Sequence, residues 1–276
     1  MNNIVEVSWL AQNINNKNII VLDASPTSNK AGLTPKFTNI QISNARFFDT
    51  ENVFVDAKNE LPNMFLSEAE FQEKCRQLGI NNESIIVVYD NIGIYMSPRV
   101  WWMFKTFGHN NVAVLNGGLN AWVEAGFTSE KKIKKTYTKG NFTANFITEN
   151  IVTANAILNN ISSEEFLVLD ARSEGRFKGE IPEPRENMQQ GHIPNSKNIH
   201  FKEVLNEGKL KSKKQLNKIF SAEVETNKKL VFTCGSGVTA CIVLLASMEV
   251  NKNKHHALYD GSWTEWGLGT KFPVIK

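Results

Sequence analysis

Cysteine is scarce in this chain, and its few positions exclude a disulfide-stabilised protein. The 276 residues include 3 cysteines, Cys75, Cys234 and Cys241, and an odd number at irregular spacing does not form a disulfide framework. Such usage is typical of a reducing compartment, so we expect a cytoplasmic protein. In that compartment the question is whether one of the thiols is reactive.

Long apolar runs and a charge excess of one sign are also lacking. No apolar run reaches the roughly 20 residues that span a bilayer, and the start MNNIVEVSWL has no basic region followed by an apolar one, as a secretory signal would. With 31 basic and 28 acidic residues, the net charge of +3 does not predict a nucleic-acid-binding protein. We therefore expect neither a membrane nor a nucleic acid as a partner.

Motifs that bind metals or phosphates are absent as well. The 5 histidines are scattered, and the adjacent His255 and His256 have no partners at metal-ligand spacing. The sequence contains no GxGxxG or Walker-type loop. We expect a protein that works without a cofactor.

What the sequence does contain is an internal repeat. Three segments of the first half return in the second half at an offset of 147 or 144 residues, which chance rarely produces. The pairs are 19–25 with 166–172, 85–90 with 229–234, and 116–122 with 260–266. We expect a first domain at 1–130, a linker at 131–144 with a solvated run of lysines, and a second domain at 145–276.

Strand-like and helix-like segments alternate within each half. In SEAEFQEKCRQLGI, Ser67 and Glu70 have the spacing of a capping box, and in PRVWWMFKTFGH, Pro98 stands in a first helical turn. Such alternation predicts an α/β fold with a mainly parallel sheet in each domain. Ligands of such sheets bind at the carboxyl ends of the strands, which directs attention to Asp90 and Cys234.

The segment LVFTCGSGVTACIV places Cys234 between an apolar strand and the start of a helix. Backbone N–H groups of the intervening loop and the helix dipole both favour an anion at the sulfur. We therefore interpret Cys234 as a nucleophile, and Cys75 and Cys241 as core residues of helices. The loop residues expected to cradle an anionic outer sulfur are Gly235, Gly237, Val238 and Thr239.

The loop CGSGVTA resembles the active-site loop of the mercaptopyruvate sulfurtransferases, a branch of the two-domain rhodanese family. The resemblance covers nearly the whole chain, including GRFKGEIPEPR (175–185), GHIPNSKNI (191–199) and YDGSWTEW (259–266). It implies two tandem rhodanese-like domains, with a catalytic cysteine in the second and Asp90 at the matching position of the first. It also implies sulfur transfer from 3-mercaptopyruvate, through a persulfide on Cys234, to cyanide or a thiol such as that of thioredoxin, with release of pyruvate.

The resemblance implies a set of functional side chains as well. Arg176 and Arg185 match positions that bind the carboxyl and keto oxygens of the donor, a task that suits forked guanidinium groups. Ser236 matches a catalytic position that polarises the donor sulfur or relays a proton. Tyr95 and Phe201 match aromatic residues of the cleft wall, which exclude water from the persulfide.

One family position differs in this chain. Accounts of the family pair the loop serine with a His and an Asp of the first domain. The family motif HIPGA reads QISNA here, so that Gln41 stands where relatives have a histidine. Because a glutamine cannot act as a base, either the triad is dispensable or the mechanism is altered.

Three alternative functions remain open. A thiosulfate sulfurtransferase would use the same nucleophile, although its dianionic donor favours basic residues where Gly235 and Ser236 stand. A cysteine phosphatase needs an arginine six residues after the nucleophile, and Ala240 occupies that position. A non-enzymatic sulfur carrier or regulatory module would have no need of Arg176 and Arg185.

Overall fold

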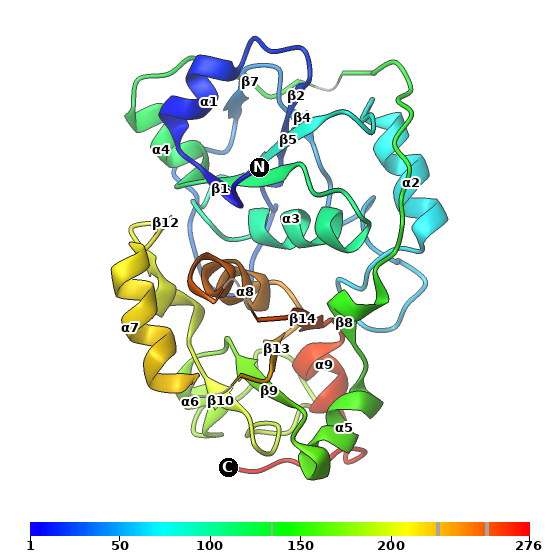
Figure 1. Cartoon of the computed structure of the whole chain (residues 1–276), viewed down its shortest axis with the longest axis vertical. Helices are drawn as coiled ribbons and strands as arrows, with labels where there is room; N and C mark the ends of the chain where they lie inside the picture. The colour runs from blue at the N-terminus through cyan, green and yellow to red at the C-terminus, as the bar shows by residue number, and fades with distance from the viewer. Residues whose placement is uncertain (134, 225–226, 252–253) are drawn as a thin grey trace. The chain divides into compact units, whose positions relative to one another are not determined.

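The computed structural model of the chain describes residues 1–133, 135–224, 227–251 and 254–276. Its contacts divide the chain into two compact units, whose elements are labelled in Figure 1. Unit 1 consists of Met1–Ala57, Phe65–Ile147 and Glu207–Leu210, and unit 2 of Lys58–Met64, Thr148–Asn206 and Lys211–Lys276. Each unit therefore contains a short segment from the opposite half of the sequence, which the repeat does not reveal.

Unit 1 is built on a five-stranded sheet of order β1-β6-β5-β2-β4, in which every pairing is parallel. The central strands β2 and β5 are apolar on both faces, as expected of strands covered on each side by helices. A separate antiparallel pair joins β3 to β7. The strands are β1 (Ile4–Val5), β2 (Ile19–Asp23), β3 (Ile40–Ile42), β4 (Arg46–Phe47), β5 (Ile85–Tyr89), β6 (Val112–Leu115), β7 (Ser129–Lys131) and β12 (Lys209–Leu210).

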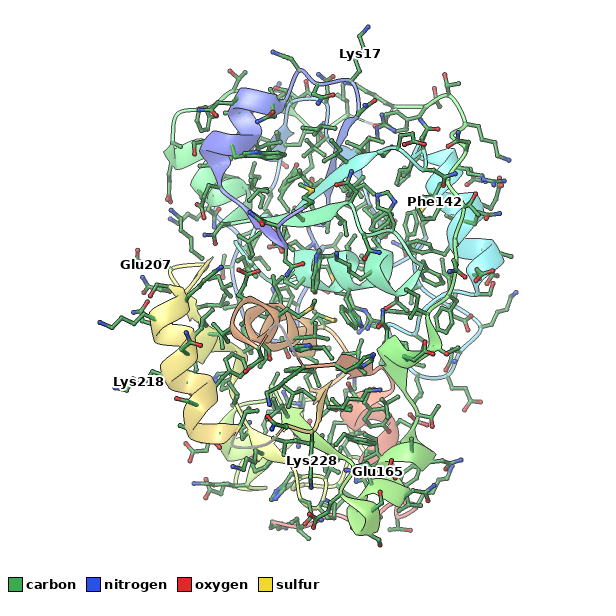
Figure 2. All side chains as sticks on the ribbon, viewed as in Figure 1. Lys17, Phe142, Glu165, Glu207, Lys218 and Lys228 are labelled. Carbon is green, nitrogen blue, oxygen red and sulfur yellow. The ribbon has the colours of Figure 1, made fainter. Side chains whose placement is uncertain are left out.

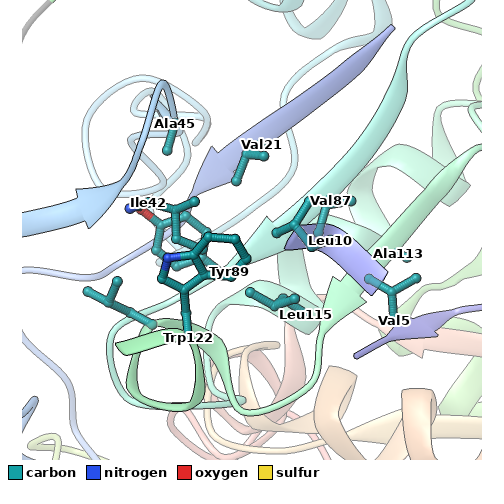
Figure 3. Close-up of a cluster of buried hydrophobic side chains, with 11 residues drawn as sticks. Val5, Leu10, Val21, Ile42, Ala45, Val87, Tyr89, Ala113, Leu115 and Trp122 are labelled. Carbon is teal, nitrogen blue, oxygen red and sulfur yellow. The ribbon is translucent and has the colours of Figure 1, made fainter. Parts of the chain in front are cut away.

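Helices cover both faces of the sheet of unit 1. α1 (Val7–Asn13) and α4 (Gly118–Glu124) pack on one face, where Tyr89 and Trp122 lie among buried aliphatic side chains (Figure 3). α2 (Glu68–Gln77) and α3 (Ser97–Thr106) lie against the other face, to which alternate strand residues point. The predicted capping box of α2 and the proline in the first turn of α3 are both confirmed.

Unit 2 repeats this architecture. Its five strands have the order β10-β9-β13-β14-β8, which matches unit 1 position for position, and every pairing is again parallel. The predicted internal repeat and the α/β class with parallel sheets are thus confirmed. The strands are β8 (Ile151–Val152), β9 (Phe166–Asp170), β10 (Lys197–Asn198), β11 (Leu205–Asn206), β13 (Lys229–Thr233) and β14 (His256–Tyr259).

The helices of unit 2 also cover two faces. α5 (Ala154–Ser163) and α9 (Ser262–Trp266) contribute to a core with Trp263 and Trp266 on one face. α7 (Lys213–Glu223) packs on α8 (Thr239–Val250), whose middle is apolar all round and fully buried. The shorter helices are η1 (Thr148–Asn150), α6 (Glu174–Phe177) and η2 (Phe201–Val204). Among the described residues, no helix has both the length and the apolar character needed to cross a membrane.

The predicted linker is tied to unit 1 at a few positions, although most of its described residues are exposed. Lys132 Nζ lies 3.0 Å from Asp23 Oδ2, whose side chain is buried at the carboxyl end of β2. Phe142, labelled in Figure 2, is also buried. Its N–H donates to the Ile80 carbonyl at 3.1 Å. Lys132 is thus partly buried, because a buried carboxylate needs a compensating charge, whereas Lys131 and Lys135 are exposed as expected of a solvated run. Lys134 of the same run lies outside the described residues.

Candidate active site

The candidate site of unit 2 is centred on the loop between β13 and α8. Cys234 directly follows β13 and is 2% exposed. Thr233, the last residue of β13, pairs with Asp170 at the end of β9, so the loop starts at the carboxyl ends of two adjacent strands. Gly237 has a φ of +77°, a left-handed conformation that glycine adopts without strain and that leads the chain into α8. The strand–loop–helix arrangement expected from the sequence is present.

The start of α9 anchors this loop. The N–H of Trp263 donates to the Cys234 carbonyl at 3.0 Å, and that of Thr264 to the Gly235 carbonyl at 2.9 Å. Ser262 Oγ accepts the N–H of Cys234 at 3.3 Å and donates to a backbone carbonyl of β14 at 2.8 Å. The sequence analysis used this motif only as a sign of the repeat and of the family resemblance, and it missed the role of the motif in orienting the peptides on both sides of Cys234.

The N–H groups that follow Cys234 are available to a ligand. Within the described residues, those of Gly235, Ser236 and Val238 donate to no protein acceptor. Successive unused N–H groups before a helix form a donor set that suits an anion. A thiolate, or the outer sulfur of a persulfide, is an anion of the size that such a loop can hold.

Two guanidinium groups lie beside the loop. Gly235 has no side chain, but the position that its Cβ would occupy lies 3.3 Å from Arg176 Nη2 and 3.9 Å from Arg185 Nη1. Arg185 Nη2 also lies 3.4 Å from Ser236 Oγ. Both predicted arginines are thus brought to the residues immediately after Cys234, where they favour an anionic substrate.

Arg176 is held in place by a series of ion pairs in which basic and acidic side chains alternate. Glu183 Oε1 accepts from Arg176 Nε at 3.1 Å and from Arg172 Nη1 at 2.9 Å. Arg172 Nη2 donates to Asp170 Oδ2 at 2.7 Å, and its guanidinium lies 3.9 Å above the Trp263 ring. Burial disfavours the charge of Arg172, but the two carboxylates outweigh burial and raise its pKa. Sequence reasoning identified neither Arg172 nor Glu183.

Ser236 is held by a side chain from much earlier in the sequence. Asn63, in the segment Lys58–Met64 of unit 2, donates through Nδ2 to Ser236 Oγ at 2.9 Å and to the Ser236 carbonyl at 3.2 Å. The Asn63 backbone has a φ of +63°, which asparagine tolerates better than most residues. Because 173 positions separate the partners, no local pattern in the sequence marks this contact.

Gln41, for which the family resemblance implied a histidine, has partners within unit 1. Its buried Nε2 donates to the Ala45 carbonyl at 3.2 Å and to Glu130 Oε1 at 2.9 Å. These bonds join the turn after β3 to β7. The side chain from the first half of the sequence that contacts Ser236 is therefore Asn63, whereas the Gln41 amide is engaged by its own unit.

The predicted aromatic wall residues belong to different units. Tyr95 lies in the loop after β5 in unit 1 and is 5% exposed. Phe201 begins η2 in unit 2, is 6% exposed, and meets the ring of His200 edge-on at 4.8 Å. Their placement in the wall of one cleft stays a prediction.

The corresponding loop of unit 1 has a carboxylate where unit 2 has a thiol. Asp90 follows β5 and is fully buried, and its Oδ2 accepts the N–H groups of Tyr95, Met96 and Ser97, each at 2.9 Å. Burial raises the pKa of Asp90, and the hydrogen bonds from Ser97 and Tyr95 only partly offset this effect. In unit 1, the side chain of Asp90 thus occupies the loop N–H groups, whereas the corresponding groups after Cys234 have no protein acceptor among the described residues.

The described residues contain no cluster arranged as a metal site, and the two cysteines other than Cys234 are buried. Within the described residues, no group of three or more His, Cys, Asp or Glu side chains is arranged to hold a metal ion. Cys75 is a free, fully buried thiol, and burial raises its pKa well above the ordinary value. Cys241 is also buried, and its Sγ donates to the Gly237 carbonyl at 3.3 Å.

Known proteins resemble this chain over almost its whole length. A family model described as "Rhodanese-like domain" matches residues 6–125 and 153–268. The 3-mercaptopyruvate sulfurtransferase of Escherichia coli (strain K12) is 36% identical over 98% of this chain and 96% of its own length. The thiosulfate sulfurtransferase of Cricetulus griseus is 37% identical over 95% of this chain and 91% of its own length. The crystal structure of SseA from Escherichia coli, a 3-mercaptopyruvate sulfotransferase, superposes with a TM-score of 0.82 at 33% identity, covering 95% of this chain and 99% of SseA.

Proposed function

The chain belongs to the rhodanese family, and from this premise we propose that it is a sulfurtransferase with 3-mercaptopyruvate as donor and Cys234 as nucleophile. The observation that carries the choice of donor is the pair of guanidinium groups beside Gly235. Relatives of similar identity are named for 3-mercaptopyruvate and for thiosulfate, so overall similarity does not decide between the donors. Two forked cations next to the thiol favour the donor that carries a carboxylate and a keto group.

The two arginines are held by different partners at the donor site. Glu183 occupies Nε and Nη2 of Arg176, which leaves fewer N–H groups of that guanidinium for a substrate. Arg185 Nη2 lies 3.4 Å from Ser236 Oγ. Both guanidinium groups therefore contribute positive charge and hydrogen bonds to the donor carboxylate, and Glu183 orients that of Arg176.

Sulfur transfer follows from this arrangement in one displacement. The Cys234 thiolate attacks the donor sulfur, the S–S bond forms, and the C–S bond breaks. The electron pair of the C–S bond stays on the carbon, which gives the enolate of pyruvate. This enolate takes up the proton that the donor thiol has lost, and pyruvate is released. The loop N–H groups of Gly235, Ser236 and Val238 stabilise the anionic outer sulfur of the resulting persulfide.

A second displacement completes the cycle. A thiolate acceptor, such as a small thiol or thioredoxin, or cyanide attacks the outer sulfur and releases the Cys234 thiolate unchanged. Such a cycle requires reduced cysteines, and Cys75, Cys234 and Cys241 are all free thiols. A cytoplasmic location fits this requirement.

Parallel assays with 3-mercaptopyruvate and thiosulfate test the proposal. We expect the higher kcat/KM with 3-mercaptopyruvate, together with a mass increase of one sulfur atom on the peptide that contains Cys234. A higher kcat/KM with thiosulfate would assign the other donor. Absence of sulfur on Cys234 after incubation with either donor would refute sulfur transfer, and loading without turnover would indicate a carrier.

A further inference from the structure

The hydroxyl of Ser236 is in contact with two groups that can only donate hydrogen bonds. Asn63 Nδ2 lies 2.9 Å from Ser236 Oγ, and Arg185 Nη2 lies 3.4 Å from it. The orientation of the Asn63 amide is set by a second contact. The same nitrogen lies 3.2 Å from the Ser236 carbonyl, which is an obligate acceptor and therefore requires the NH₂ group at this position.

This surrounding determines what the hydroxyl itself can do. A serine hydroxyl has two lone pairs and one proton, and here both lone pairs face donors. Within the described residues, the proton of Ser236 has no protein acceptor. The O–H group is thus left to donate to a molecule bound at the loop.

We propose that Asn63 is a positioning residue that orients Ser236 as a hydrogen-bond donor to the bound sulfur donor. The inference rests on the proposed function, because it concerns the same site. Neither the Asn63 NH₂ group nor the Arg185 guanidinium can accept a proton from Ser236. Ser236 therefore acts as a fixed hydrogen-bond donor and not as a link in a proton relay.

Substitutions at Asn63 that differ in hydrogen-bonding character test this role. Asn63→Asp keeps the shape of the side chain but replaces the hydrogen-bond donor by an acceptor. The Ser236 hydroxyl would then donate to this aspartate and not to the substrate. We therefore expect kcat with 3-mercaptopyruvate to fall about a hundredfold. Asn63→Ala removes the contact and should lower kcat about tenfold, with little change in KM. Asn59→Ala, an exposed residue of the same segment, is the matched control and should leave kcat unchanged.

A double-mutant cycle separates positioning from simple stabilisation. In a Ser236→Ala background, Asn63→Ala should cause no further loss of kcat, because its partner is already absent. Asn63→His introduces a base, so its kcat relative to wild type should change with pH around 6.5, whereas that of Asn63→Ala should stay constant.

Two results would overturn the inference while wild type remains active. One is wild-type kcat in Asn63→Asp. The other is a loss in Asn63→Ala that is as large without the Ser236 hydroxyl as with it. If the wild-type chain itself formed no persulfide from 3-mercaptopyruvate, the proposed function would fail instead, which single-turnover loading of Cys234 measures beforehand.

Discussion

Three cysteines in this chain have three different surroundings. Cys234 follows a strand and is succeeded by N–H groups without protein acceptors, next to two guanidinium groups. Cys75 lies on the buried side of α2, where burial raises its pKa and keeps the thiol protonated. Cys241 donates its S–H to a loop carbonyl. Reactivity at the residue scale therefore depends on which groups surround the sulfur.

Serine substitutions at the three positions should separate them. We expect Cys234→Ser to abolish sulfur transfer, because an alcohol neither ionises at neutral pH nor forms a persulfide. Cys241→Ser keeps a donor to the Gly237 carbonyl and should retain activity. Cys75→Ser should also remain active, at some cost in stability from a hydroxyl in an apolar core. Measurable transfer in purified Cys234→Ser would remove the nucleophile from the mechanism.

Arg185 provides the test of donor choice. Charge-assisted hydrogen bonds contribute about 1.5–3 kcal/mol each, so Arg185→Ala should lower kcat/KM for 3-mercaptopyruvate by one to two orders of magnitude, roughly. Thiosulfate has no carboxylate, and its turnover should fall less. Arg176→Ala should also lower kcat/KM for 3-mercaptopyruvate, because it removes the second guanidinium beside Gly235.

Lys178→Ala is the matched control for the loss of a cation near the site. Lys178 is exposed and paired with Glu174, and its removal should change neither donor's turnover. Equal losses for both donors in Arg185→Ala would mean that Arg185 acts through general charge or through folding.

At the scale of elements, the parts predicted from the sequence are those set by local chemistry. The capping box at Ser67, the proline in α3 and the helix after Cys234 each depend on a few adjacent residues. The arginines were found because their family motif is continuous. Asn63 and Ser262 were missed, since their contacts with the loop join positions far apart in the chain.

The hydrogen bonds of Gln41 make a prediction at this scale. Gln41→Ala should destabilise unit 1 by about 1 kcal/mol, because the Ala45 carbonyl and the half-buried Glu130 carboxylate lose a shared donor between β3 and β7. Its kcat should change far less than the roughly 100-fold that a general acid or base contributes. Urea unfolding and steady-state assays of one preparation measure both quantities. A 100-fold loss of kcat at unchanged stability would assign Gln41 a catalytic role.

At the scale of the whole chain, the repeat predicted two similar folds but not how the sequence is shared between them. Unit 2 contains 58–64, and unit 1 contains 207–210. The repeat was found by matching segments of the first half to segments of the second half. Such a match does not show that a short segment of one half belongs to the unit formed by the other. As a result, neither half of the sequence alone contains both Asn63 and Ser236.

Stability of the chain should depend on pH through His256. Burial lowers the pKa of His256 to about 4, and its Nδ1 and Nε2 contact the Lys254 carbonyl and Ser247 Oγ, so the folded state keeps the ring neutral. In the unfolded chain the ring takes up a proton near pH 6.5. The stabilising contribution is therefore complete above about pH 6.5 and is lost as pH falls toward about 4.

The expected size of this effect is about 2 kcal/mol between about pH 7 and about pH 5. Urea midpoints of wild type and His256→Gln at both pH values measure it, and the variant should show a smaller decrease at the lower pH. Parallel pH profiles of wild type and variant would show that another group is responsible.

The loop at Asp90 has a consequence for the number of ligands that the two corresponding loops can bind. The two units contain corresponding loops, and in unit 1 the side chain of Asp90, which is covalently part of the chain, accepts the N–H groups of Tyr95, Met96 and Ser97. Because Asp90 occupies these N–H groups, the loop of unit 1 cannot offer them to a bound ligand. On the mechanism proposed above, only the loop of unit 2 can carry a sulfur atom, although the loop architecture is present twice.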